Sequence, residues 1–572
     1  MAELISNERV DDIPLLLSQM QTLGLSELVD EHFVPHGNWQ GLSLGKVVSG
    51  WLSYILSQGD HRLNQVEDWA ESLSISLKAC LSESLRPLDF SDDRLATVLD
   101  ELSNDLAWEY FEGALTSQTV RVYDLSVETV RIDTTTASGH REPTPDGLFQ
   151  FGHSKDYRPD LPQVKISQAA LDPLGMPVST SVVSGNRADD PLYIPEIKQV
   201  QRYLSKSGLL YVGDSKMSAI DTRGYLAKSE NCYLCPLPEV QVSKADLAEL
   251  LAPMFRGEED LDSIAPPDVK VTGTSHAETS AETEAIAEGF AITMPQSLGT
   301  GAERFTWTEQ WLVVRSFKHQ QRQQSGLDQR LEKATEALAN LNVRGRGHKR
   351  LSLEETIVAA EKILKRYRVT SLLQVDYETI TQSIHKRAYR DKPARTLTET
   401  TVDVKATLNS DAYEQAQRLL GWRVYVSNDL ELSLSDAVYG YRNEYLIERC
   451  FGRYKGKALG LTPLFLASDQ RVKGLIRLLS IGLRILCLLE FSVRSTLDST
   501  QQELAGLYAG NPKRATAKPT AELLLRAFRG ITLTVIKING TLQYFLSALS
   551  DRQQRILQLL RASDDIYLSL TG

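Results

Sequence analysis

Three polar side chains of different chemistry recur at seven-residue intervals in the segment YRNEYLIERCFGRYKG. They are the phenol of Tyr441, the carboxylate of Glu448 and the ammonium of Lys455. Seven residues span nearly two α-helical turns, so the spacing predicts one helical face that carries all three groups. A core helix would repeat apolar residues on such a face. The segment therefore indicates either a solvated helix laced by ion pairs or one arm of a polar site.

Two aspartates upstream lie where strands are expected. Asp133 falls within the β-branched run TVRIDTTTAS, and Asp214 closes the apolar run in GLLYVGDSKMSA. An aspartate at a strand end is more often a cap or a turn former than a ligand. Carboxylates on neighbouring strand ends can nevertheless converge, and a helix can bring Glu448 to them. The combination favours a shared site.

Three carboxylates without a matching set of histidines and cysteines suit a hard cation, Mg²⁺ or Mn²⁺, with oxygen ligands. Paired metal ions of this kind activate water or a hydroxyl and stabilise the leaving oxygen of a phosphodiester. The residues therefore predict phosphoryl transfer, with two metal ions in the active site.

The alternation of apolar and polar residues predicts the elements that position these carboxylates. QVKISQAAL and MPVSTSVVSG are period-2 runs joined by the turn sequence DPLG, which predicts a hairpin. A helical pattern over residues 190–204 and the strand before Asp214 follow. This order predicts an α/β fold whose mixed sheet has its first strand, with Asp133, in the centre.

These residues resemble a known enzyme family. The chain resembles the DDE transposases of bacterial insertion sequences, in the subgroup with a Tyr, Arg, Glu and Lys signature around the third catalytic carboxylate. Tyr441, Glu448 and Lys455 match the signature spacing. Glu444 stands where the family has its arginine, and Arg442 is the nearest substitute. The resemblance covers residues 120–495.

The resemblance implies an RNase H-like catalytic core in which Asp133, Asp214 and Glu448 are the catalytic, metal-binding triad. It implies cut-and-paste transposition, in which strands are cleaved at the element ends and the freed 3′-hydroxyl is joined to target DNA. The partners would be the terminal inverted repeats and the target DNA, bound by a homodimer. Tyr441, Arg442 and Lys455 would contact DNA.

Three further residues are candidates for DNA contacts. Lys155 and Arg158, in FGHSKDYRPDLPQ, would either contact DNA or order the loop around the site. Trp422 would stack on a base, with a place in the core as its alternative. Two other functions stay open. The replaced signature arginine allows an inactive DNA-binding relative, and the same fold allows an RNase H-like nuclease without strand transfer.

Composition alone does not indicate a DNA-binding protein. The chain has 63 Lys and Arg against 74 Asp and Glu, a net charge of −11, whereas a phosphate-binding surface should be basic. The acidity is local, because residues 1–120 carry a net charge of −14 and residues 239–289 carry −9. The remaining residues, which hold the candidate carboxylates, carry +12.

Length and patterning predict several domains. The expected divisions are a helical N-terminal domain (1–118), the first part of the catalytic core (119–236), a β-rich and helical insertion (237–430) with a flexible acidic segment (255–289), the second part of the core (431–495) and a C-terminal helical region (496–572). The N-terminus has no signal-peptide pattern, and Arg477 and Arg484 interrupt the most apolar stretch, so no membrane span is expected. A cytoplasmic bacterial protein is predicted.

Overall fold

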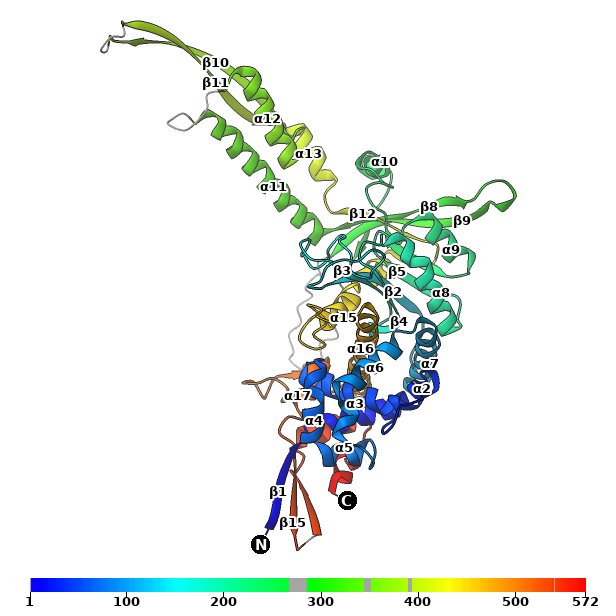
Figure 1. The fold of residues 1–572 in the computed structure, drawn as a ribbon. Coiled ribbons are helices and arrows are strands. Elements are labelled where there is room, and N and C mark those ends of the chain that lie inside the picture. The colour runs from blue at the N-terminus through cyan, green and yellow to red at the C-terminus, as the bar shows by residue number, and fades with distance from the viewer. Residues whose placement is uncertain are drawn as a thin grey trace. The chain divides into compact units, whose positions relative to one another are not determined.

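The computed structural model describes residues 2–35, 37–266, 285–343, 351–388, 393–539 and 541–571. The chain forms two compact units, which are described separately. Unit 1 contains residues 1–235, 296–307 and 439–572, and unit 2 contains residues 236–295 and 308–438. The fold is mixed α/β with a helical N-terminal region (Figure 1).

Helices dominate the first part of unit 1, as leucines and aromatics at three- and four-residue steps predict. They are α1 (Ile13–Thr22), α2 (Leu25–His32), α3 (Leu44–Gln58), α4 (Val66–Ser72), α5 (Ser74–Cys80), α6 (Asp92–Leu102) and α7 (Asp105–Tyr123). The side chains of Ser43 and Asn104 cap the first turns of α3 and α7. Trp51 and Trp108 are buried in the core of this region.

A mixed sheet forms the second part of unit 1. Its strands are β2 (Thr129–Ser138), β3 (Gln163–Leu171), β4 (Met176–Ser184), β5 (Leu210–Gly213) and β6 (Cys232–Pro236), in the order β4-β3-β2-β5-β6. β2 pairs antiparallel with β3 and parallel with β5, and β5 pairs parallel with β6. Helices α8 (Tyr193–Leu204) and α9 (Ile220–Lys228) follow β4 and β5. The prediction that the strand with Asp133 is central is confirmed.

The β3–β4 hairpin is also confirmed, and its turn packs closely on another element. Gly175 has φ +68° in this turn. A Cβ atom there would lie 3.0 Å from the carbonyl oxygen of Leu446 and 3.1 Å from Sγ of Cys450. Glycine is therefore required both by the backbone conformation and by the close approach.

The last part of the chain supplies helices α14 (Leu434–Arg442), α15 (Tyr445–Lys455), α16 (Asp469–Ser499), α17 (Ala521–Arg526), α18 (Asp551–Leu559) and α19 (Asp565–Leu568), with the short strands β13 (Leu504–Ala505) and β14 (Ala515–Thr516). α16 is buried over most of its length, and its charges are paired: Arg484 donates to Glu112 at 2.8 Å and to the carbonyl of Pro177 at 2.8 Å. No helix among the described residues is long and apolar enough to cross a membrane.

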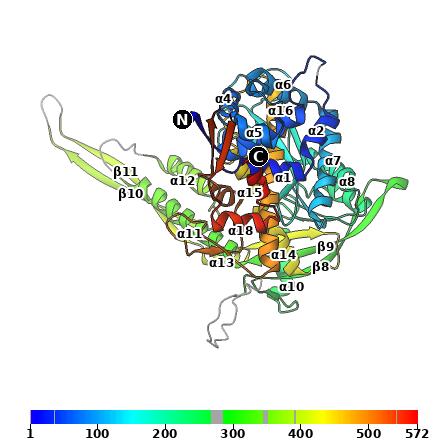
Figure 2. The same cartoon turned by 90° about the horizontal axis from the view of Figure 1, so that it is seen from below.

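The two ends of the chain meet in one small sheet. β1 (Ala2–Arg9) pairs antiparallel with β15 (Thr532–Ile538), which pairs with β16 (Thr541–Leu546). Both views show the two termini on the same side of unit 1 (Figures 1 and 2). The region predicted as helical over residues 496–572 thus also contains strands.

Unit 2 is β-rich with long helices. Its strands β12 (Trp422–Ser427), β9 (Phe305–Ser316), β8 (Ala287–Leu298) and β7 (Asp262–Ile264) lie in that order. A long hairpin, β10 (Leu373–Lys386) and β11 (Arg395–Leu408), accompanies helices α10 (Lys244–Phe255), α11 (Phe317–Ala339), α12 (Leu353–Tyr367) and α13 (Ser410–Arg418). Of the acidic segment 255–289, residues 262–264 and 287–289 are in strands, and residues 267–284 lie outside the described residues.

Candidate active site

Asp133 and Asp214 come from the two parallel strands at the centre of the unit 1 sheet. In the β2–β5 ladder Ile132 pairs with Gly213, so the two aspartates are the next residues along neighbouring strands. Both line one small pocket. Its lining residues are Arg131, Ile132, Asp133, Val212, Gly213, Asp214, Tyr441, Glu444 and Ile447. The predicted convergence of these two carboxylates is therefore observed.

Asp133 is held in a partly buried position. Its Oδ1 accepts the N–H of Thr134 at 2.7 Å and the ammonium of Lys155 at 3.2 Å. Burial raises the pKa of Asp133 to about 6, Lys155 and Thr134 oppose the shift, and the charge of Asp214 adds to it. The site thus brings two like charges close together and partly offsets them with one cation.

Asp214 is oriented by two donors. The hydroxyl of Tyr193, on α8, donates to its Oδ1 at 2.7 Å, and the N–H of Lys216 donates to the same oxygen at 2.8 Å. Tyr193 is buried, and burial together with Asp214 and Asp133 raises the pKa of its hydroxyl well above the usual value. Tyr193 therefore remains a hydrogen-bond donor to the carboxylate.

The expectation that one helical face carries Tyr441, Glu448 and Lys455 is wrong. Tyr441 belongs to α14, whereas Glu448 and Lys455 belong to α15. Between the helices the N–H of Glu444 donates to the Tyr441 carbonyl at 3.0 Å, a bond that spans three residues and tightens the backbone. Only Glu448 and Lys455 share a helix.

The interruption between α14 and α15 changes which carboxylate faces the pocket. Glu444 lines it, whereas Glu448 is exposed and is not among the lining residues. Burial raises the pKa of Glu444, a hydrogen bond from Tyr441 lowers it, and the charges of Asp133, Glu448 and Asp214 raise it further. Four carboxylates therefore act on one another here, and Glu444, which replaces the signature arginine, is the more enclosed of the two glutamates.

Helix α15 is held in place by contacts with α16 and with the β3–β4 turn. The buried carboxylate of Glu490, on α16, pairs with Arg449 and Arg453 of α15 and also accepts the N–H of Ala521 at 2.9 Å. Sγ of Cys450 donates to the Gly175 carbonyl at 2.9 Å. These contacts hold α15 against the hairpin turn and α16, and so determine where Glu448 lies.

The two lysines that sequence analysis assigns to DNA have partners inside unit 1. Lys455 donates to Oγ1 of Thr135 at 2.8 Å and pairs with the carboxylate of Asp156. Lys155 donates to the Thr134 carbonyl at 2.6 Å and pairs with Asp133. Both ammonium groups therefore order the site in this structure.

The remaining DNA-contact candidates lie in different settings. Arg442 and Arg158 are exposed, and the Arg158 guanidinium pairs with Asp160 at 2.8 Å. Trp422 is in unit 2, where it is 5 % exposed. Its ring packs against Phe290 in the unit 2 core, which agrees with the alternative of a core tryptophan.

Sequence reasoning missed two residues that position the site. Arg131 forms a bidentate ion pair with Asp172 at 2.7 and 2.6 Å and donates to the Gly440 carbonyl at 2.6 Å. The sequence did indicate the role of Arg131, because an arginine inside a β-branched strand requires a buried acidic partner. Tyr193 was missed because a tyrosine at the start of an amphipathic helix is usually a core residue.

The carboxylates of the pocket have the donor chemistry that a hard cation requires. Asp133 and Asp214 present carboxylate oxygens to one pocket, which is the donor chemistry of Mg²⁺ and Mn²⁺. Within the described part of the chain no three Asp, Glu, His or Cys side chains are placed to hold one ion. Mg²⁺ is usually bound through one or two carboxylates plus substrate phosphates, so the two aspartates fit such an ion.

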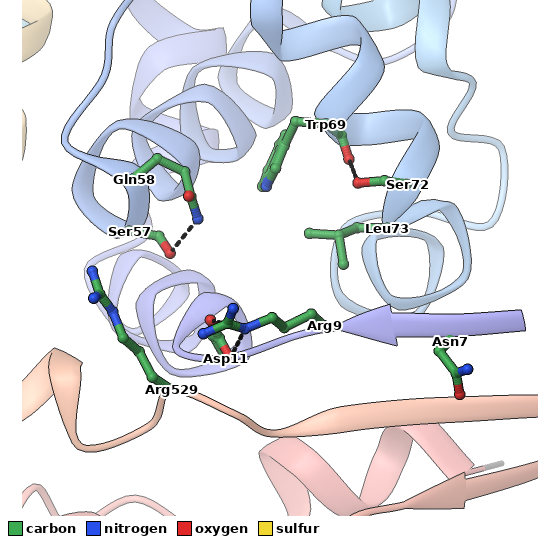
Figure 3. A pocket seen from close by; sticks show the side chains of 9 residues that line it. All are labelled: Asn7, Arg9, Asp11, Ser57, Gln58, Trp69, Ser72, Leu73 and Arg529. Carbon is green, nitrogen blue, oxygen red and sulfur yellow. Dashed lines mark hydrogen bonds and ion pairs between the residues drawn. The ribbon is translucent and has the colours of Figure 1, made fainter.

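A second, larger pocket of unit 1 contains none of the predicted site residues. Its volume is about 460 Å³, and it lies between β1, the end of α3, α4 and the segment before β15. Figure 3 shows Trp69 and Gln58 facing Arg9 and Asp11 across it, with Arg529 at one end. Asp11 accepts the N–H of Gly530 at 2.6 Å, so this pocket marks the junction of the two chain ends.

Comparison with solved structures finds a likeness to a piggyBac transposase in a synaptic complex with hairpin DNA, determined by cryo-electron microscopy. The identity is 9 %, the TM-score is 0.33, and the match covers 90 % of this chain and 76 % of that one. No curated protein matches the sequence. Residues 5–113, which contain α1 to α6 and the first half of α7, match the family model described as a domain of unknown function, DUF4277.

Proposed function

We propose that this protein is a DDE-type transposase, which cleaves DNA strands at the ends of its element and transfers the freed 3′-hydroxyl to target DNA. The observation that carries the proposal is the meeting of Asp133 and Asp214 on neighbouring parallel strands, in one pocket bordered by the segment that joins α14 to α15. Carboxylates so placed suit metal-dependent phosphoryl transfer.

The topology of the sheet supports an RNase H-like core. An antiparallel series, β4-β3-β2, continues into the parallel strands β5 and β6. In this arrangement the central strand carries the first aspartate and its parallel neighbour ends at the second. A helix late in the chain, α15, supplies the third carboxylate.

We assign that third carboxylate to Glu448, because it matches the transposase signature in its spacing from Tyr441 and Lys455. Glu444, in contrast, lines the pocket that the two aspartates share. Its carboxylate adds negative charge where the family has a cation, so it strengthens the local demand for metal ions. The two glutamates are separable by substitution.

Each residue of the site has its own proposed role. Asp133 and Asp214 would hold the divalent cation, Mg²⁺ or Mn²⁺, and Tyr193 keeps Asp214 oriented through its 2.7 Å hydrogen bond. The chemistry that bound metal ions supply is activation of water or a 3′-hydroxyl and stabilisation of the leaving oxygen. Arg131 holds the end of α14 on the sheet through the Gly440 carbonyl.

DNA and a second copy of the chain complete the proposal. The partners are the terminal inverted repeats and the target DNA, because a phosphodiester is the substrate of such a site. Arg442 and Arg158 are exposed and are the best-placed cations for phosphate contacts. Two ends must be joined together, so we propose that a homodimer acts on them, in the bacterial cytoplasm.

The test is a plasmid that carries the flanking inverted repeats of the gene, incubated with purified protein and Mg²⁺. A transposase gives excised element and joined products. Simple cleavage without joining would indicate a nuclease, and end binding without cleavage would indicate an inactive DNA-binding relative. D133N serves as the control, because it should retain end binding and lose all Mg²⁺-dependent nicking.

A further inference from the structure

The loop after β2 touches both parts of the candidate active site through two adjacent residues. Lys155 reaches Asp133, the first candidate metal ligand, and Asp156 pairs with Lys455 at the end of α15. One dipeptide therefore connects the central strand with the helix that carries Glu448. The resemblance to transposases left the role of this SKDYRPD segment open between DNA contact and loop order.

The ammonium of Lys155 is enclosed by oxygen atoms of β2. It lies 2.6 Å from the carbonyl oxygen of Thr134, 2.8 Å from Oγ1 of the same residue and 3.2 Å from Oδ1 of Asp133. A set of oxygen ligands around a compact charge is also what a divalent metal ion requires. Lys155 therefore supplies positive charge to the carboxylate that is expected to bind the metal.

The second carboxylate near Lys155 is already neutralised by another residue. Asp189 lies 3.7 Å from the Lys155 ammonium, but the nearly buried Lys165 pairs with it at 2.6 Å. Asp133 has no other cationic partner among the described ion pairs. The charge of Lys155 is therefore directed mainly to Asp133.

The loop backbone can stay in place while the Lys155 side chain moves. The N–H of Lys155 donates to Oγ1 of Thr136 at 3.0 Å, and the neighbouring Asp156 is anchored by Lys455. The Lys155 side chain retains 27 % of its exposure, so it has a route to solvent. A flexible four-carbon stem allows the ammonium to leave without rearranging the loop.

We propose that Lys155 is the counter-ion of Asp133. Its ammonium pairs with this carboxylate in the metal-free protein and moves away when a divalent cation binds. The inference rests on the proposed function, since it assumes that Asp133 is a metal ligand. Its consequence is that Lys155 competes with the metal. Removal of its charge should strengthen metal binding and weaken the metal-free fold.

Isothermal titration with Mn²⁺ at fixed ionic strength tests this competition. K155M should bind Mn²⁺ about tenfold more tightly than the wild type, because a close opposite charge shifts a carboxylate equilibrium by a factor of this order. K155R, which keeps the charge, should stay near the wild type. K228M is the matched control, since Lys228 is an exposed lysine in the last turn of α9 and does not line the site. In EDTA, K155M should melt at a lower temperature than K228M.

The results distinguish the counter-ion role of Lys155 from metal binding by Asp133. If D133N loses Mn²⁺ binding but K155M binds no more tightly than K228M, the counter-ion role of Lys155 is wrong and the assignment of Asp133 as a metal ligand is supported. If the wild type binds no Mn²⁺, or D133N binds it as well as the wild type, the metal centre and the role of Lys155 both fail. Should K155M not fold, K155Q removes the charge, keeps a donor for Thr134 and is measured in the same way.

Discussion

At the scale of single residues, Asp133 occupies a position that favours its protonated form. Its pKa is raised to about 6 by burial and by Asp214. A carboxylate whose pKa is higher in the folded than in the unfolded state stabilises the fold at low pH, and this contribution is lost as the pH rises through the folded value. In EDTA near pH 7.5, D133N should therefore be more stable than the wild type by roughly 3 kcal/mol.

Thermal unfolding of both proteins across the pH range measures this difference. The two midpoints should converge below about pH 3, where Asp133 is protonated in both the folded and the unfolded chain. D146N, at an exposed aspartate, should follow the wild type throughout. A D133N protein that is less stable than the wild type at neutral pH would show that the Lys155 pair outweighs the burial of the charge.

Glu444 and Glu448 make a second residue-scale prediction. E448Q should lower the nicking rate by about 100-fold or more, the scale of a lost catalytic group, because Glu448 is the proposed third carboxylate. E444Q should keep the rate within about tenfold of the wild type, since the change leaves the assigned triad intact. Single-turnover nicking of a labelled element end gives both rates. The reverse order of effects would transfer the catalytic role to Glu444.

At the scale of elements, the position of α15 depends on a buried ion cluster. Glu490 is 3 % exposed and holds Arg449 and Arg453 of α15 together with Arg494 of α16. E490Q would remove the charge that Arg449, Arg453 and Arg494 share and would leave the buried Arg453 with Glu522 alone, which should cost about 3 kcal/mol of folding free energy. Thermal unfolding would show the loss, and nicking should fall with it because α15 loses its anchor. E503Q, at an exposed glutamate, should change neither property.

The elements also show how far the sequence predicts the site. Period-2 runs and the DPLG turn correctly place β2 to β5, because local alternation and turn chemistry determine them, so the approach of Asp133 to Asp214 could be predicted. The interruption between α14 and α15 could not, since no proline or glycine occurs between Tyr441 and Glu448 to mark it. It depends on tertiary contacts such as the bond from Arg131 to Gly440.

At the scale of unit 1, the two ends of the chain are tied together. Asp11 accepts the N–H of Gly530 at 2.6 Å and pairs with Arg9 at 2.9 Å, and the hydroxyl of Tyr567 donates to the Asp11 carbonyl at 2.9 Å. D11A should lower stability by about 1–3 kcal/mol, because the N–H of Gly530 loses a charged acceptor. Hydrogen exchange should then rise in both β1 and β15. Faster exchange in β1 alone would show that the contacts of Asp11 do not stabilise β1 and β15 together.

Asp133 and Asp214 are the proposed ligands of the metal ions that support DNA cleavage, and a change of metal preference at Asp214 probes this role. A cysteine thiolate binds softer metal ions better than it binds Mg²⁺. The D214C protein should therefore fail to nick an element end in Mg²⁺ and regain nicking in Mn²⁺, whereas the wild type should nick in both. Nicking by D214C in Mg²⁺ at the wild-type rate would contradict the proposed metal-binding role of Asp214.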